Sequence, residues 1–291
     1  MPFFSIIIPI YNTNRVLLEK CFDSIKKQIF VDYEIIVIND CSVNIETIAF
    51  IKNLINVKII NNVDNLGLAM SRNIGINYSN GQYIVFCDSD DYLSPDALDI
   101  MHHYIKHIPN LDILSYEVVF CKNDALYKPK NGRTNTLYHK LTNFELQPVI
   151  IQNRVPVWSH CYHKNFLIDN NIFFNDAKKF GEDLYFHILS FAKAKKIYSI
   201  PEEIYVYREY VNDSITSKTI SENKIDDALY FLMEACNELL KNSNMDIMCI
   251  KIIYTFFYDN YILLLVKNIK EHYWFDSINQ KYKDFLNKNF N

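Results

Sequence analysis

The chain has 291 residues, of which 49% are hydrophobic and 22% are charged, and its formal net charge is −4. This length and composition suit one large α/β domain, or one domain with an appendage. The slight negative charge argues against a general nucleic-acid-binding protein, because phosphate backbones require a basic face.

The cysteines and the N-terminus indicate a protein of a reduced compartment. The seven cysteines are scattered along the chain and form no C-x-x-C pair, which fits a place where thiols stay reduced. The first twelve residues contain a short apolar run with no positive charge before it, so we expect no signal peptide. No uninterrupted apolar stretch reaches the roughly 18–20 residues that a membrane-spanning helix needs.

The first hundred residues alternate between strands and helices. Continuous β-branched runs indicate buried strands, and apolar stripes indicate helices. Strands are predicted at 4–10, 34–38, 57–60 and 83–87, and helices at 15–29, 44–55 and 67–79. This alternation predicts a parallel sheet with helices on both faces.

The remainder of the chain is predicted to be mixed and then helical. Further strands are expected at 111–120, 196–200 and 204–208, a polar loop that is mobile or a hairpin at 121–140, and helices at 96–107, 144–153, 164–170 and 181–195. Beyond a boundary near 218 the pattern predicts helices at 222–241, 245–270 and 273–289.

Polar residues follow three of the predicted parallel strands. Tyr11 and Asn12 follow the first strand, Asn39 and Asp40 the second, and the segment 88–91 the fourth. Ligands of such sheets bind beyond the carboxyl ends of the strands, so these side chains mark the expected site.

The segment 88–91 places three carboxylates within four residues, at Asp88, Asp90 and Asp91. Clustered carboxylates repel one another unless a positive charge lies among them, and a divalent cation bound to a phosphate would supply it. The alternative is a solvated acidic turn before a helix.

Five segments together resemble the family 2 glycosyltransferases with the GT-A fold, over roughly residues 3–218. They are SIIIPIYN (5–12), EIIVINDCS (34–42), NLGLAMSRNIG (65–75), GQYIVFCDSDDYL (81–93) and GEDLYF (181–186). The resemblance implies a mostly parallel central sheet flanked by helices, with a C-terminal all-helical extension. It implies a catalytic domain over 1–218, with a nucleotide-binding half over 1–95 and an acceptor half over 96–218, and a helical region over 219–291.

The resemblance also implies which residues bind a UDP-sugar donor. The donor-binding set is Asp40 at the uracil ring, Pro9, Tyr11 and Asn12 around the base, Arg72 near the nucleotide, Asp88 at the ribose, and Ser89 beside it. A carboxylate suits the uracil position because it accepts a hydrogen bond from an imide N–H.

The remaining implied roles concern the metal and the chemistry. Asp90 is expected to hold Mn²⁺ or Mg²⁺ between the two phosphates, where the metal offsets charge on the leaving UDP. Asp91 caps the following turn or orients the donor sugar. Asp183 is expected to act as the general base, because inversion requires a carboxylate opposite the leaving group, and Glu182 to shape the acceptor pocket. The alternative for Asp183 is a helix N-terminal acid favoured by the helix dipole.

Three positions depart from the family pattern or leave alternatives open. Trp158-Ser159-His160 stands where the family often has W-x-K. His160 takes the phosphate role of that Lys, or is a packed histidine beside Trp158. We assign Trp158 to the substrate site. Cys41 replaces a glycine that the family usually has after Asp40. Arg208 binds the diphosphate, or is an ordinary arginine at a strand end.

The C-terminal helices are expected to cap the catalytic domain or to form a homodimer interface. Peripheral contact with a membrane surface is the alternative, since residues 252–266 are apolar nearly all round. Residues 221–291 hold eight lysines against ten acidic residues, which argues against strong attraction to anionic lipid.

The expected activity is inverting transfer of a hexose or N-acetylhexosamine from a UDP-sugar to a glycan or lipid-linked glycan, with a β linkage. The resemblance implies a role in capsule, lipooligosaccharide or O-antigen synthesis, in the cytoplasm or peripherally at the inner face of the cell membrane. A non-catalytic nucleotide-sugar-binding protein of the same fold is the alternative. A nucleotidyltransferase would need a Gly- and Arg/Lys-rich loop after the first strand, and residues 11–14 are not such a loop.

Overall fold

The computed structural model describes residues 1–128, 155–209, 221–242, 245–267 and 273–290. The helix predicted at 144–153, and the part of the predicted loop beyond residue 128, lie outside these ranges.

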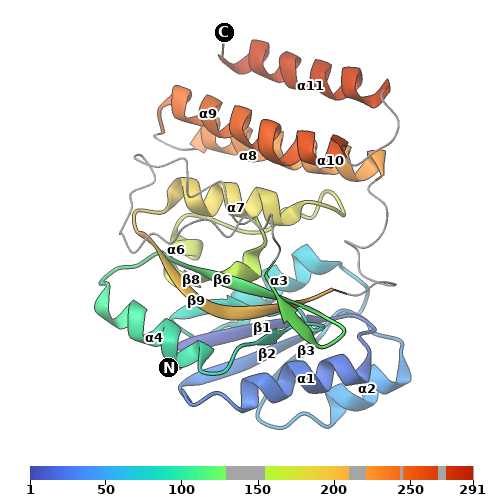
Figure 1. Ribbon diagram of the computed structural model, residues 1–291, viewed down its shortest axis with the longest axis vertical. Helices are drawn as coiled ribbons and strands as arrows, with labels where there is room; N and C mark the ends of the chain where they lie inside the picture. Colours follow the sequence, from blue (N-terminus) through green and yellow to red (C-terminus); the bar gives the residue numbers. More distant parts are fainter. Residues whose placement is uncertain (129–154, 210–220, 243–244, 268–272, 291) are drawn as a thin grey trace.

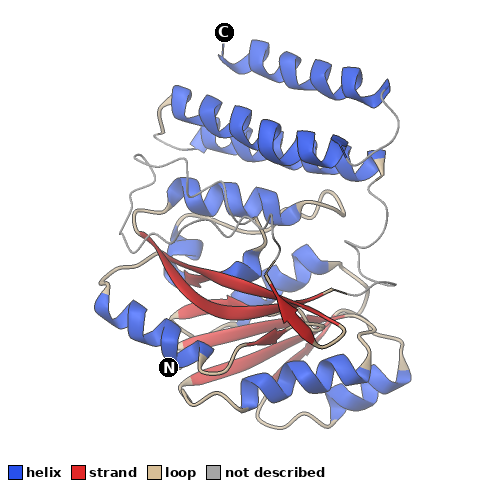
Figure 2. Cartoon of the chain, in the orientation of Figure 1, coloured by secondary structure: helices blue, strands red, loops and turns tan. Residues whose placement is uncertain are grey.

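The described residues form a mixed sheet of nine strands at the centre of the molecule (Figure 2). The strands are β1 (Phe4–Ile10), β2 (Tyr33–Asn39), β3 (Lys58–Asn61), β4 (Tyr83–Phe86), β5 (Tyr92–Leu93), β6 (Ile113–Lys122), β7 (Ala125–Tyr127), β8 (His160–His163) and β9 (Ile197–Arg208). Their order is β3-β2-β1-β4-β8-β6-β9-β5, with β7 paired to β6. The four strands from β3 to β4 are parallel, as predicted, and β8 enters antiparallel to β4 and β6.

Side-chain alternation along the strands divides the core between the two faces of the sheet. Ile7 and Phe86 point to one cluster, and Ile6 and Val85 point to the other. The first face is covered by α3 (Leu68–Tyr78), α6 (Lys164–Asp169) and α7 (Glu182–Lys193), and the second by α1 (Arg15–Lys26), α2 (Ile45–Lys52) and α4 (Ala97–His107). Strands buried on both faces explain the continuous apolar runs that predicted them.

The C-terminal helices stack on α7, farther from the sheet (Figure 1). They are α8 (Glu222–Asn242), α9 (Ile247–Phe257), the π-helical turn η3 (Tyr258–Ile262), α10 (Leu263–Lys267) and α11 (Tyr273–Phe290). Buried residues of these helices belong to the same hydrophobic cluster as α3 and α7. The division near residue 218 therefore stays a prediction, because the helices share their core with the sheet domain.

One helical stretch of the described chain is long and apolar enough to cross a membrane by length and composition alone. It is Ile247–Val266, with a mean hydropathy of 1.5. Ile253, Tyr254 and Phe257 pack inward from it. Core helices of soluble proteins share this length and composition, and membrane contact stays a prediction.

Two predicted elements differ from the structure. Before β8, the chain forms a 3₁₀ turn over Val157–Ser159. The two strands predicted at 196–200 and 204–208 are one strand, β9, whose pairing with β6 shifts register between Ser115 and Val118. The helix predicted at 245–270 is interrupted by η3.

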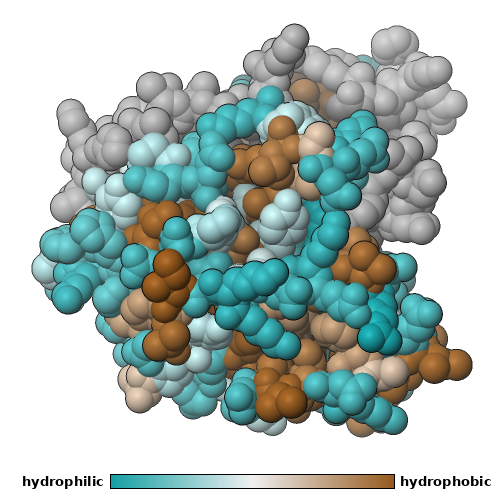
Figure 3. All heavy atoms as spheres, turned by 60° about the horizontal axis from the view of Figure 1, so that its bottom comes forward, coloured by the Kyte–Doolittle hydropathy of each residue, from teal (hydrophilic) through white to brown (hydrophobic). Residues whose placement is uncertain are grey.

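The surface around α1 and α2 is a mosaic. On the face turned forward in Figure 3, hydrophobic residues are scattered among hydrophilic ones. The exposed large apolar residues on or beside these two helices are Val16, Ile29, Val31, Val43, Ile45 and Ile55. Isolated exposed apolar residues are ordinary on protein surfaces and need no ligand to explain them.

Candidate active site

The predicted polar positions meet at the carboxyl end of the parallel strands. β1, β2 and β4 run side by side and in the same direction, so the residues after each strand emerge at one edge of the sheet. The hydroxyls of Thr13 and Ser89, which follow β1 and β4, lie 2.6 Å apart. This contact joins two of the predicted segments directly.

The loops after β1 and β2 are built around Asn12. Its Oδ1 accepts hydrogen bonds from the backbone N–H groups of Val43 (2.8 Å) and Asn44 (2.9 Å). Asn12 and Cys41 both have left-handed backbones, with φ of 52° and 59°. A left-handed φ favours glycine, which explains why the family pattern has glycine where this chain has Cys41.

Asp40 organises the loop that leads into α3. Its carboxylate is 4% exposed and accepts hydrogen bonds from Asn62 Nδ2 (2.7 Å) and from the backbone N–H groups of Leu66 and Gly67 (both 2.8 Å). Tyr11 is 52% exposed, whereas Pro9 is buried within β1. Tyr11 therefore offers an accessible ring at the predicted base pocket, and Asp40 holds the loop that borders it.

The acidic segment after β4 separates into three environments. Asp88 Oδ1 pairs with Arg72 Nη2 at 2.9 Å. Asp90 is half-buried, and burial together with the charge of Asp88 raises its pKa to about 6. Asp91 is 1% exposed, and burial and the neighbouring Asp90 raise its pKa well above the usual range. Arg72 pairs with Asp88, and Asp91 is buried. Asp90 is thus a partly exposed carboxylate with little positive charge beside it.

Asp91 is held by β9. Its Oδ2 accepts a hydrogen bond from the Tyr205 hydroxyl (2.8 Å), and its Oδ1 accepts one from the backbone N–H of Arg208 (2.7 Å). The same Tyr205 hydroxyl accepts a hydrogen bond from the backbone N–H of Asp88 (3.0 Å). Tyr205 was not among the predicted site residues: alternation in the strand places it, but only the partner loop gives its hydroxyl a role.

Replacing Tyr205 by phenylalanine is expected to lower the free energy of unfolding by about 1–3 kcal/mol. The substitution leaves a buried carboxylate oxygen and a backbone N–H without partners, and unmade buried hydrogen bonds cost this much. Urea denaturation measures the effect. Tyr198→Phe on the same strand is the control, because the Tyr198 hydroxyl makes no hydrogen bond within the described chain; equal losses in the two variants would contradict the role of Tyr205.

Arg208 presents a buried guanidinium beside the acidic segment. It is 5% exposed, and its Nη2 donates to the carbonyl of Leu17 (3.1 Å). Its positive charge partly opposes the rise in the pKa of Asp90. Its Nε and Nη1 have no hydrogen-bond partner among the described residues. Buried donors of this kind call for a partner, and phosphate oxygens match the geometry of a guanidinium.

Glu182 and Asp183 open helix α7. Gly181 precedes them with a left-handed φ of 97°. Asp183 Oδ1 lies 2.6 Å from Arg72 Nη1, and its Oδ2 accepts a long hydrogen bond of 3.4 Å from the backbone N–H of Val157. Burial raises the pKa of Asp183 and Arg72 opposes that rise, whereas burial and Asp183 raise the pKa of Glu182 to about 7.

Arg72 lies at the centre of these carboxylates. It is 1% exposed and contacts Asp88, Asp183 and, at 3.4 Å, Glu182. The structure therefore brings together Arg72, Asp88, Glu182 and Asp183, which the resemblance had divided between donor and acceptor. The guanidinium of Arg72, which was predicted near the nucleotide, forms ion pairs with carboxylates of the protein itself.

Trp158 and His160 point to different surroundings. The Trp158 ring stacks on Tyr205 and Tyr207, with centroids 4.8 and 5.3 Å away. His160 is 1% exposed and packs against Phe191, with centroids 4.9 Å apart. His160 thus lies in a buried aromatic environment, and its role at the phosphates stays a prediction.

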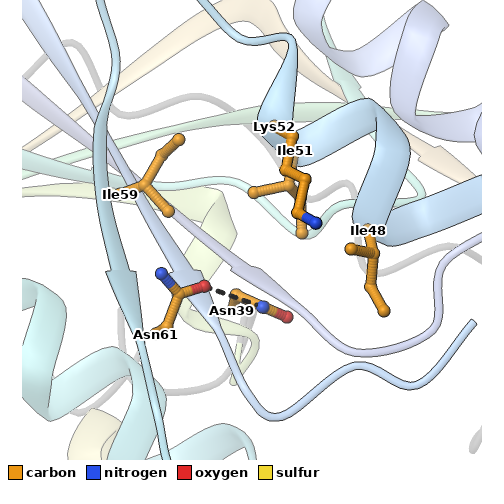
Figure 4. A pocket seen from close by; sticks show the side chains of 6 residues that line it. All are labelled: Asn39, Ile48, Ile51, Lys52, Ile59 and Asn61. Atoms are coloured by element: carbon orange, nitrogen blue, oxygen red, sulfur yellow. Dashed lines mark hydrogen bonds between the residues drawn. The ribbon is translucent and has the colours of Figure 1, made fainter. Parts of the chain in front are cut away.

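A cavity of about 210 Å³ lies between α2 and the edge strands (Figure 4). Its lining residues are Asn39, Ile48, Ile51, Lys52, Ile59 and Asn61. None of the predicted site residues lines it, and its walls carry no carboxylate. The cavity therefore lacks the chemistry of a metal–diphosphate site.

No group of three or more His, Cys, Asp or Glu side chains able to hold a metal occurs within the described ranges. The resemblance implies a cation at Asp90, bound between the two phosphates of the donor. Mg²⁺ commonly binds in this way, through one or two carboxylates and substrate phosphates.

Comparisons with known proteins agree with this arrangement. The chain is 30% identical over 218 residues to the uncharacterized glycosyltransferase EpsJ of Bacillus subtilis, covering 73% of this chain and 62% of EpsJ. It is 26% identical over 212 residues to the poly(ribitol-phosphate) β-N-acetylglucosaminyltransferase TarS of Staphylococcus aureus, covering 70% of this chain and 35% of TarS. The chain thus spans less than two thirds of either relative.

The fold comparison reaches further along the chain. The crystal structure of S. aureus TarS 1–349 in complex with UDP-GlcNAc matches with a TM-score of 0.79 at 20% identity, covering 99% of this chain and 81% of that one. This match confirms the predicted GT-A fold with C-terminal helices. The family model described as Glycosyl transferase family 2 matches residues 5–166, more than half of the sequence. The chain belongs to glycosyl transferase family 2.

Proposed function

We propose that this protein is an inverting glycosyltransferase that moves a hexose or N-acetylhexosamine from a UDP-sugar to a glycan acceptor with a β linkage. The observation that carries the proposal is the pairing of Asp88 and Asp183 through one guanidinium. This pairing sets the acidic segment after β4 opposite the acid that opens α7. An in-line displacement needs these two sides: one for the leaving UDP and one for the acceptor proton.

The donor side is assigned to the loops at the carboxyl ends of β1, β2 and β4. Tyr11 offers an exposed ring for the uracil, and Asp40 with Asn12 holds the surrounding loops. The hydroxyl of Ser89 lies beside Thr13 at the same edge. Asp88, whose Oδ2 has no hydrogen bond among the described residues, is assigned to the ribose.

The diphosphate is assigned to Asp90 and Arg208. The raised pKa of Asp90 marks a carboxylate that a cation would stabilise, and the two unpaired donors of Arg208 fit phosphate oxygens. A bound Mn²⁺ or Mg²⁺ would offset the negative charge that develops on the departing UDP. Asp91 fixes the segment 88–91 to β9, because it accepts hydrogen bonds from the Tyr205 hydroxyl and the backbone N–H of Arg208.

The acceptor side is assigned to Asp183, with Glu182 and Trp158 bordering the acceptor. The acceptor hydroxyl oxygen attacks the anomeric carbon from the face opposite UDP, and the bond from that carbon to the phosphate oxygen breaks. The electron pair leaves with UDP, and the hydroxyl proton passes to Asp183. Oδ2 is the better acceptor of this proton, because Oδ1 is bound to Arg72 at 2.6 Å.

The acceptor is proposed to be a surface glycan, and the place of action the cytoplasm or the inner face of the cell membrane. The support comes from the relatives, since TarS acts on poly(ribitol phosphate) by its name. A non-catalytic nucleotide-sugar-binding protein remains the rival function.

A donor screen separates the two functions. UDP release is measured over UDP-glucose, UDP-galactose and their N-acetyl forms with Mn²⁺, using poly(ribitol phosphate) and neutral oligosaccharides as acceptors. We expect acceptor-dependent release with one of these donors. Calorimetric binding of UDP-sugars without any release would support the binding-protein rival instead.

A further inference from the structure

One arginine joins three carboxylates that lie far apart in the sequence. Arg72 Nη2 is 2.9 Å from Asp88 Oδ1, while its Nη1 is 2.6 Å from Asp183 Oδ1 and 3.4 Å from Glu182 Oε1. The guanidinium is 1% exposed, so it has almost no surface left for a nucleotide. Its donors thus serve the two sides of the site from within the protein.

The guanidinium is itself held in place. The neighbouring Asn73 exchanges two hydrogen bonds of 2.8 Å with the backbone of Phe174. Arg72 lies over the Phe174 ring at 5.4 Å, and that ring stacks on Phe186 of α7 at 4.1 Å. These contacts join helices α3 and α7 around the ion cluster, and they hold the Arg72 guanidinium within it.

The cluster has more negative than positive charge, which creates competition for a proton. Burial raises the pKa values of Asp183 and Glu182 alike, and Arg72 opposes both shifts. Arg72 is much closer to Asp183 than to Glu182. The cation therefore favours the ionised form of Asp183 and leaves any shared proton on Glu182.

We propose that Arg72 is a positioning residue that keeps Asp183 ionised, fixes its orientation so that Oδ2 is not bound to the guanidinium, and couples it to Asp88. Its catalytic meaning rests on the proposed function, but the ionisation of Asp183 can be measured without turnover. The charged or titratable groups that face Asp183 are Arg72, Asp88, Glu182 and Tyr162. Burial raises the pKa of Tyr162 well above its usual range, so that hydroxyl stays neutral in the range of interest.

The test is a pH titration of the Asp183 carboxyl ¹³C resonance, assigned by its loss in Asp183→Asn. Arg72→Gln is expected to raise the midpoint by about one to three pH units, because it removes the nearby cation. Asp88→Asn is expected to lower the midpoint, because it removes a like charge that raises the pKa of Asp183. Arg15→Gln, at an exposed arginine that pairs only with Glu19 among the described residues, is expected to leave the midpoint unchanged.

In Arg72→Gln the acid limb of kcat/KM should move in the same direction as the midpoint, with UDP affinity within about twofold of wild type. Unchanged midpoints in both Arg72→Gln and Asp88→Asn would overturn the inference. If Arg72→Gln does not fold, the Asp88→Asn midpoint is the deciding measurement. Shifted midpoints in a protein that turns over no UDP-sugar would support the ion cluster and reject the proposed function, so the two failures are distinguishable.

Discussion

Replacing Asp183 by asparagine is expected to reduce sugar transfer by about 10²–10⁴-fold, the usual contribution of a positioned general base. Asparagine has nearly the same shape, and its side-chain oxygen still accepts a hydrogen bond from Arg72. Its amide nitrogen has no proton-accepting ability, so the acceptor hydroxyl keeps its proton during attack. UDP binding should persist, because Asp183 lies on the acceptor side of the proposed site.

The measurement is the rate of UDP release at saturating donor, together with the calorimetric affinity for UDP. Asp176→Asn is the matched control, because Asp176 is exposed and precedes the same helix. Full activity in Asp183→Asn would remove Asp183 from the role of base and leave the helix-cap interpretation. Loss of UDP binding in the same variant would instead show that it disturbs the donor side.

The parallel half of the sheet was predictable because burial on both faces leaves a simple signal. Each of β1, β2 and β4 contains an apolar run, and polar residues follow each run in the sequence. Topology then requires these polar ends to meet at one edge. The location of the site therefore follows from sequence periodicity and from the geometry of parallel sheets.

The partners of individual side chains were not predictable in the same way. Arg72 binds groups 16, 110 and 111 residues away along the chain, and no periodicity encodes such distances. Asp91 has no sequence feature that separates it from Asp90. Within the described chain, however, it is Asp91 that accepts hydrogen bonds from β9, from the Tyr205 hydroxyl and the backbone N–H of Arg208. Roles of this kind depend on packing between distant segments.

The difference between the two predicted strands and β9 has a local physical cause. In β9, the polar pair Glu202 and Glu203 broke the apolar pattern and suggested two strands. The pairing of β9 with β6 shifts register near this position, and the backbone of β9 stays extended through it.

Replacing Asp90 by alanine is expected to weaken metal-dependent UDP binding about tenfold or more. Loss of outer-shell partners of metal ligands already costs 10–100-fold in affinity, and Asp90 is the proposed direct ligand. Titration calorimetry with UDP and Mn²⁺, repeated with EDTA, measures the effect. Asp99→Ala, at an exposed aspartate on α4, is the matched control.

The pH dependence of UDP binding gives a second measure of the same ligand. Burial and Asp88 raise the pKa of Asp90 to about 6, and a metal binds the ionised carboxylate. Metal-dependent affinity should therefore be full near pH 7.5 and fall as the pH drops through about 6, whereas Asp90→Ala should lose this dependence. An affinity for UDP that is unchanged by EDTA, by pH and by the Asp90 substitution would contradict the metal site. It would mean that Arg208 and the strand-end loops bind the diphosphate without a metal.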